Sequence, residues 1–251
     1  MVVVKTAREL SKMKDACRIS AEALRVAGEA VKPGVTTYEI DNIVRSYIEK
    51  QGASSLVSRL RRLSCRVRAF PLTMWLSMAY PVKNSFLKEG DIVSVDVGAF
   101  YGGFHGDNAF TFPCGKISAD AQALLDATKE SLYEGIKQAL AFNRVGDIGN
   151  AVQKYVEARS YSVVRDFVGH GVGAKLHEDP SVPNYGTAHR GVRLIPGMTI
   201  AIEPMVNQGR CNVRVLDDKW TTVTADGKLS AHFEHTVAIT PDGPKIMTLC
   251  D

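Results

Sequence analysis

The sequence contains two weakly similar halves, and this internal repeat limits the folds that the chain can adopt. IDNIVRSYIE at residues 40–49 matches IGNAVQKYVE at 148–157, and LKEGDIVSVDVG at 87–98 matches LIPGMTIAIEPM at 194–205. The offsets are 108 and 107 residues, so the register is nearly constant. A helix and a strand repeated over that distance are too long for a solenoid unit. Chance similarity between amphipathic helices is the alternative, but two matches at one offset favour a duplicated half-domain with pseudo-twofold symmetry.

Each of four strand-like segments carries one acidic residue on its less apolar face. Successive side chains of a strand point to opposite sides of a sheet, so the acid in IVSVDVG lies opposite a row of three valines. A lone acid in such a strand is usually a rim residue, but four buried together need compensating cations. The repeat also sets Asp96 opposite Glu203 across the expected central cleft. The acids are Asp96, Asp107, Glu203 and Glu234, and His170 lies in a separate GHGVG segment.

This donor set predicts a metal centre. Carboxylate oxygens with one imidazole suit divalent ions such as Mn, Fe, Co or Zn. Two ions held by shared carboxylates can make a hydroxide nucleophile available near neutral pH. The pattern therefore indicates a dinuclear metallohydrolase.

Helices are predicted in the first part of each half. Thr6 with Glu9 and Thr36 with Glu39 have capping-box spacing before apolar-periodic runs. In the second half, we expect a helix from Ser118 to about residue 142 and another from Asp147 to about residue 159. Together these elements predict an α+β fold, an antiparallel sheet with helices on its outer face. No linker or low-complexity stretch divides residues 1–251, so we expect one catalytic domain.

Composition favours a cytoplasmic protein without membrane or nucleic-acid partners. The five cysteines are scattered and form no CxxC pair, which is typical of reduced thiols. No apolar run is long enough to span a bilayer, and the N-terminus lacks the order of a signal peptide. Five arginines within residues 53–82 exceed the whole formal net charge of +4. The basic character is therefore local, and no specific nucleic acid is expected.

With these motifs in view, the chain resembles the type I methionine aminopeptidases, which have the pita-bread fold. The resemblance covers residues 1–52 and 83–251. It depends on KEGDIVSVDVGAFYGGFHGDNAFTF, FVGHGVGAKLHEDP, GMTIAIEPM and HFEHTVAIT. The implied activity is removal of the N-terminal methionine from nascent peptides by hydroxide attack on the first peptide bond. The implied location is the cytoplasm, and ribosome association is a further expectation.

The resemblance also implies roles for individual residues. Glu203 would be the proton shuttle, and His177 would stabilise the carbonyl oxygen of the substrate. Trp220 resembles the aromatic wall beside the substrate cleft. Without the resemblance, His177 would be read as a surface loop residue and Trp220 as a core residue. Two metal ions are implied: Asp96 would chelate one, His170 and Glu203 the other, and Asp107 and Glu234 would bridge both.

Residues 54–82 depart from the family pattern. The family has a Gly-Phe-Pro-Ala-Ser stretch and then a strand ending in His-Gly-Ile-Pro, whose histidine contacts substrate. Met78 takes the place of that histidine, with Pro81 and Asp96 at the expected spacing from it. Residues 69–81 can be written in codons that encode a different segment when they are read in a shifted reading frame. That segment ends in His-Gly-Ile-Pro. We therefore interpret the segment as a compensated pair of frameshifts. True divergence with a surface arginine loop is the alternative, and an RNA-binding arm is a weaker one.

Two other functions remain open. A catalytically impaired pita-bread homologue that binds peptide or metal would explain the missing histidine. A proline-specific relative, an aminopeptidase P or prolidase, would use the same five ligands. Those enzymes usually carry an additional N-terminal domain, for which we expect no room in this chain. The IEPM motif is also more similar to that of the methionine aminopeptidases.

Overall fold

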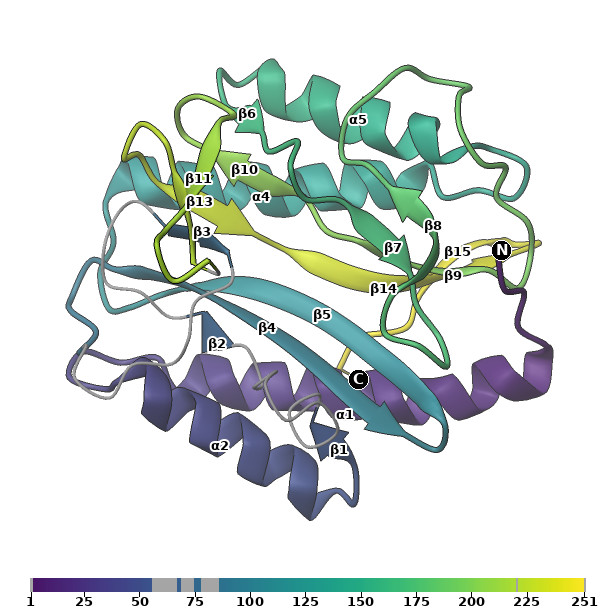
Figure 1. The fold of residues 1–251 in the computed structure, drawn as a ribbon, viewed down its shortest axis with the longest axis horizontal. Coiled ribbons are helices and arrows are strands. Elements are labelled where there is room, and N and C mark those ends of the chain that lie inside the picture. Colours follow the sequence, from purple (N-terminus) through teal and green to yellow (C-terminus); the bar gives the residue numbers. More distant parts are fainter. Residues whose placement is uncertain (1, 56–66, 69–74, 78–85, 220, 251) are drawn as a thin grey trace.

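Figure 1 shows the computed structural model, which describes residues 2–55, 67–68, 75–77, 86–219 and 221–250. Most of the segment interpreted as frameshifted lies outside these residues. Among the described residues, the main sheet has nine strands, and all of its pairings are antiparallel. Its main path runs β1 (Ser54–Ser55), β4 (Ile92–Tyr101), β5 (Phe104–Pro113), β14 (Glu234–Thr240), β9 (Thr199–Ile202), β7 (Gly169–Gly171) and β8 (Glu178–Val182).

The remaining strands extend this sheet or form two small ones. β2 (Val67–Arg68) pairs with β4, and β15 (Gly243–Ile246) pairs with β14. One small sheet contains β6 (Ser162–Val163), β10 (Met205–Asn207) and β13 (Ser230–His232). The other contains β3 (Trp75–Ser77), β11 (Val213–Val215) and β12 (Thr222–Thr224).

Four helices lie in the described residues: α1 (Ala7–Ala30), α2 (Thr37–Lys50), α4 (Ala119–Lys137) and α5 (Val145–Glu157). Both predicted capping boxes are confirmed, at the starts of α1 and α2. Ser118 caps α4 as predicted, but the helix ends well before residue 142. It ends there because the chain turns away to hydrogen-bond with Leu194.

The predicted N-cap of α5 was wrong by three residues, since Arg144 and not Asp147 is the N-cap. Asp147 does not precede the helix but is its third residue, and the helix starts at Val145. The Asp147 carboxylate reaches back and accepts the Arg144 backbone N–H at 2.8 Å. An acid in the first turn also suits the positive end of the helix dipole.

The predicted duplication is visible in the backbone. The Gly34 N–H donates to the Leu87 carbonyl, and the equivalent Phe142 N–H donates to the Leu194 carbonyl, both at 2.8 Å. Each of these contacts lies where the chain enters the second helix of its half. Gly90 and Gly197, equivalent in the repeat, have φ angles of 95° and 94°. The two halves therefore share turns as well as helices and strands.

Each half has its own apolar core on the helix side of the sheet. In Figure 1, α1 and α2 flank β4 and β5, and α4 and α5 flank the half that contains β9 and β14. Alternate valines of β4, from Val93 to Val97, pack in one cluster with α1 and α2. Ile200 and Ile202 of β9 pack in a second cluster with α4 and α5. The alternate side chains of these strands therefore point to the opposite face of the sheet.

None of the helices in the described part of the chain has the length and apolar character needed to cross a membrane.

Candidate metal centre

Three of the predicted acids lie on neighbouring strands around one small residue. Ala109 of β5 pairs with Asp96 of β4 on one side and with Glu234 of β14 on the other. Asp107 lies two residues before Ala109 and so shares its face of the sheet. The methyl side chain of Ala109 leaves space between the carboxylates. This face is opposite the one that packs against the helices.

Glu203 lies just after β9 and not within a strand as predicted. Pro204 follows it, and proline has no N–H to continue the ladder, so the strand ends at Ile202. The Glu203 carbonyl instead accepts a hydrogen bond from the Asn184 side chain at 3.0 Å. The Glu203 side chain still reaches the same site as the strand-borne acids.

His170 faces the carboxylates from β7. Its Nδ1 lies 2.8 Å from the Gly171 carbonyl, which suits Nδ1–H as the donor. Its Nε2 then points to Asp107 Oδ2 at 3.7 Å and Glu203 Oε1 at 3.6 Å. Burial lowers the pKa of His170 to about 4, against an opposing effect of nearby acids such as Asp96. The imidazole is therefore neutral at pH 7, the form that binds metals.

The donors are arranged as a metal site requires. Ligand atoms of Asp107, His170 and Glu234 lie within 4.8 Å of one another, and so do those of Glu203, His232 and Glu234. Glu234 belongs to both groups. The three carboxylates are at most 8% exposed, and bringing such like charges together away from water is costly without a cation. These residues fit divalent cations. Asp96 shares the sheet face but belongs to neither group.

His232, to which the sequence analysis gave no role, lies in one of the two candidate groups. It is 1% exposed, and its Nε2 lies 3.6 Å from Glu203 Oε2. Its position two residues before Glu234 was the available signal, since such residues share a face in an extended chain. In the structure His232 ends β13 and Glu234 begins β14, with Phe233 between the two strands.

His177 lies beside the candidate ligands but outside both groups. Its ring centroid is 4.4 Å from that of His170, in an edge-to-face arrangement. It is exposed and immediately precedes β8. This position allows contact with a substrate. Trp220 and Met78, the other residues of interest on the substrate side, lie outside the described residues.

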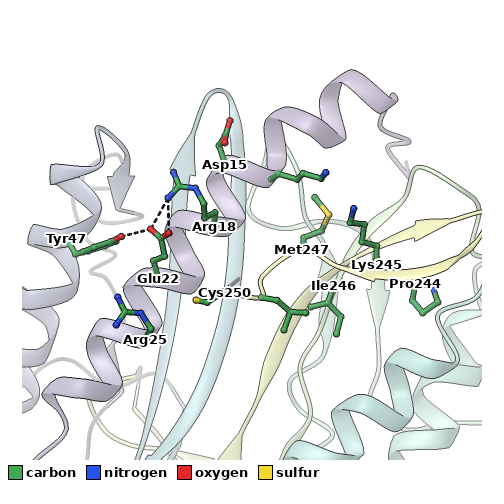
Figure 2. Close-up of a pocket in the computed structure, with 12 residues that line it drawn as sticks. Asp15, Arg18, Glu22, Arg25, Tyr47, Pro244, Lys245, Ile246, Met247 and Cys250 are labelled. Carbon is green, nitrogen blue, oxygen red and sulfur yellow. Dashed lines mark hydrogen bonds and ion pairs between the residues drawn. The ribbon is translucent and has the colours of Figure 1, made fainter.

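A groove of about 1010 Å³ lies elsewhere, between α1 and the C-terminal segment (Figure 2). Arg18 and Tyr47 both hydrogen-bond to Glu22 along its wall. Its lining contains none of the candidate metal ligands. It therefore belongs to the helix side of the molecule and not to the site.

Fold and site together define a duplicated α+β protein with carboxylates and histidines gathered on one face of its sheet. The profile of Metallopeptidase family M24 matches residues 11–241. A methionine aminopeptidase from Clostridium perfringens is 49% identical over 99% of both chains. The crystal structure of methionine aminopeptidase from Thermotoga maritima has a TM-score of 0.92 and 41% identity over 99% of both chains. The chain belongs to metallopeptidase family M24, and its resemblance to the methionine aminopeptidases is confirmed.

The proline-specific relatives share the fold but less of the sequence. The Xaa-Pro dipeptidase from Bacillus anthracis has a TM-score of 0.76 at 21% identity, and the match covers 62% of that chain. This likeness shows the fold alone.

Proposed function

We propose that this chain is a metal-dependent aminopeptidase that removes the N-terminal methionine from peptides. The observation that carries the proposal is full-length similarity to methionine aminopeptidases at 49% identity. The buried cluster around Glu234 supports it chemically, because it gathers the donor types that a hydrolytic metal centre needs.

The residues that would hold two divalent ions are Asp96, Asp107, His170, Glu203 and Glu234. Such ions supply Lewis acidity and make a hydroxide nucleophile available near neutral pH. We assign no preference among Co, Mn, Fe and Zn, since this donor set suits each of them.

Two residues would carry the proton and charge movements. Glu203 would accept a proton at its carboxylate and deliver it to the leaving amine nitrogen. His177 would donate a hydrogen bond to the scissile carbonyl oxygen, whose negative charge grows as the bond breaks. Its exposed ring beside His170 is consistent with that role. Trp220 would form part of the substrate wall.

We further propose that the whole chain acts as one catalytic domain on nascent peptides, in the cytoplasm and close to the ribosome. The main sheet runs through both halves, so neither half completes the candidate site alone. The four described cysteines are free, which suits a reducing compartment.

An impaired homologue is the second candidate, because Met78 replaces the expected substrate-contacting histidine. A thioether is only a weak acceptor and cannot donate a hydrogen bond. In that case the chain would bind ions and peptide without useful turnover.

The test is a peptide-cleavage assay on the metal-loaded chain. Met-Ala-Ser should lose its first residue, while Leu-Ala-Ser and Ala-Pro-Ser should stay intact. Mass spectrometry of the products identifies the bond that is cut. Preferential cleavage before proline would favour the proline-specific alternative. Bound metal without cleavage of any peptide would favour the impaired homologue.

A further inference from the structure

The exposed His177 lies at the end of the loop, residues 172–177, that joins β7 to β8. The first part of the loop is held by β9, because the Val172 N–H donates to the Thr199 carbonyl at 3.1 Å. The Gly173 N–H donates to the Lys175 carbonyl at 3.0 Å. An exposed ring gains little orientation from its own packing, so its position depends on how the loop is anchored.

Glu178, the next residue after His177, ties the loop at two points. Its Oε1 accepts the Lys175 backbone N–H at 3.0 Å. Its Oε2 accepts a hydrogen bond from Lys5 Nζ at 2.7 Å. One carboxylate thus joins the loop to itself and to the N-terminal segment of the chain.

The Lys5–Glu178 ion pair is buried although it lies next to an exposed residue. The two side chains are 3% and 5% exposed. The Lys5 backbone N–H also donates to the Gly197 carbonyl at 2.8 Å, which fixes the segment at the turn before β9. A Cβ on Gly173 would lie 2.5 Å from Lys5 Cε, so the loop packs directly on the lysine. A surface ion pair would contribute little, but a desolvated pair with this geometry constrains both of its partners.

We propose that Lys5 is a positioning residue, and that its ion pair with Glu178 holds the 172–177 loop so that His177 stays beside His170 and can reach the substrate. In the described part of the chain, Lys5 Nζ donates to the Val3 carbonyl and to Glu178, so we expect it to act through the loop. The proposal rests on the proposed function for its role in turnover, but the position of the His177 ring can be measured without turnover.

The first test is a double-mutant cycle on kcat/KM for Met-Ala-Ser. Lys5→Met should lower kcat/KM by about 10- to 100-fold, since small misplacements of a catalytic group have effects of that size. In a His177→Ala background the same change should alter kcat/KM by no more than about twofold, as expected when the residue acts through His177. Lys12→Met, which removes an exposed cation from α1, is the matched control and should have no effect. Equal losses in both backgrounds would overturn the proposal.

Removing Lys5 alone leaves the Glu178 charge buried without its partner, which can prevent folding. A second variant tests the proposal in that case. The double change Lys5→Met with Glu178→Gln removes both charges and keeps a carbonyl acceptor for the Lys175 N–H. This variant should show a cooperative thermal unfolding transition and bind the same amount of metal as the unaltered chain. Its kcat/KM should still be lower than that of the unaltered chain. Full activity in this folded variant would contradict the proposal.

Histidine-ring NMR separates failure of this inference from failure of the proposed function. In the folded variant, the ring signals of His177 should shift and broaden, while those of the distant, exposed His189 should not change. His177→Ala assigns the signal. If the unaltered chain cleaves no peptide, the proposed function fails, but the NMR result still decides whether Lys5 positions the ring. Unchanged His177 signals would overturn the proposal.

Discussion

At the scale of single residues, the candidate site depends on how acids from separate strands meet around Ala109. Asp96 and Glu234 flank this alanine on two neighbouring strands, and Asp107, two residues before it, shares its face of the sheet. His170 adds a neutral imidazole from the far part of the sheet. The candidate site is therefore assembled from both halves of the chain, and strand register places its residues on β4, β5 and β14.

Asp107→Asn and Glu234→Gln should each lower metal binding more than Asp96→Asn does. The reason is that the two residues are proposed to bridge both ions, and an amide lacks the negative charge that a carboxylate brings to a cation. Metal content after dialysis, measured by mass spectrometry, checks this, with circular dichroism to show that each variant folds. Unchanged occupancy in both bridging variants would show that the ligands are misassigned.

His177→Ala should leave metal content near that of the unaltered chain and reduce turnover. Loss of one donor to a developing oxyanion typically costs about 10²–10³ in rate. The measurement is kcat on a Met-peptide beside metal analysis of the same sample, using protein with residues 54–82 restored so that there is ample activity to lose. A variant that loses metal would place His177 among the ligands instead.

The sequence was sufficient to predict which acids share a face, because alternation in a strand requires only local information. The same alternation places His232 on the face of Glu234, but its contact with Glu203 also depends on the pairing of β10 with β13, which a local pattern does not predict. The end of β9 at Ile202 was also missed, although Pro204 signals it. Trp220 lies outside the described residues, so its role stays a prediction.

At the scale of elements, the repeated turns show how the same local structure meets different surroundings. Gly90 and Gly197 have nearly the same φ angle, 95° and 94°, a value that residues other than glycine rarely adopt. A Cβ at Gly197 would lie 2.7 Å from the Lys5 carbonyl oxygen, whereas at Gly90 it would lie 3.9 Å from the Lys116 carbonyl oxygen. The repeat therefore offers a matched pair of substitutions.

Gly90→Ala should lower the free energy of unfolding by about 1–2 kcal/mol, the cost of a left-handed conformation for an alanine. Gly197→Ala should lower it further, because the added methyl group also displaces the N-terminal segment. Urea unfolding of the two variants provides the comparison. A smaller loss of unfolding free energy for Gly197→Ala than for Gly90→Ala would mean that the N-terminal segment can move without destabilising the fold.

The helices illustrate what capping patterns can and cannot predict. Thr6 and Thr36 were located correctly because a capping box uses only nearby residues. The end of α4 was placed too late because Phe142 is drawn into a contact with Leu194, which is distant in sequence.

At the scale of the whole molecule, two half-domains with separate cores share one sheet, and the candidate site lies where they meet. The duplication was readable in the sequence because both the second helix and the first long strand of each half kept recognisable residues. The order of strands across the sheet was not readable, since pairing between β5 and β14 joins segments far apart in the chain.

The chain as written should cleave Met-Ala-Ser far more slowly than a version with residues 54–82 restored to the shifted frame. Metal ligands supply the nucleophile, but rate also depends on holding the scissile bond in place. Both proteins are compared at equal metal content, with their sequences verified by mass spectrometry. Equal turnover would show that the segment is a functional variation and not a defect.

The most direct measurement is methionine release by one preparation of the chain, followed through removal and return of divalent metal. We predict release from Met-Ala-Ser in the loaded protein, loss after chelation, and recovery when about two equivalents of metal are returned, because two ions are expected to be held by shared carboxylates. The restored version should behave in the same way at a higher rate. Release that persists after complete removal of metal, or its absence from both fully loaded versions, would contradict a metal-dependent methionine aminopeptidase.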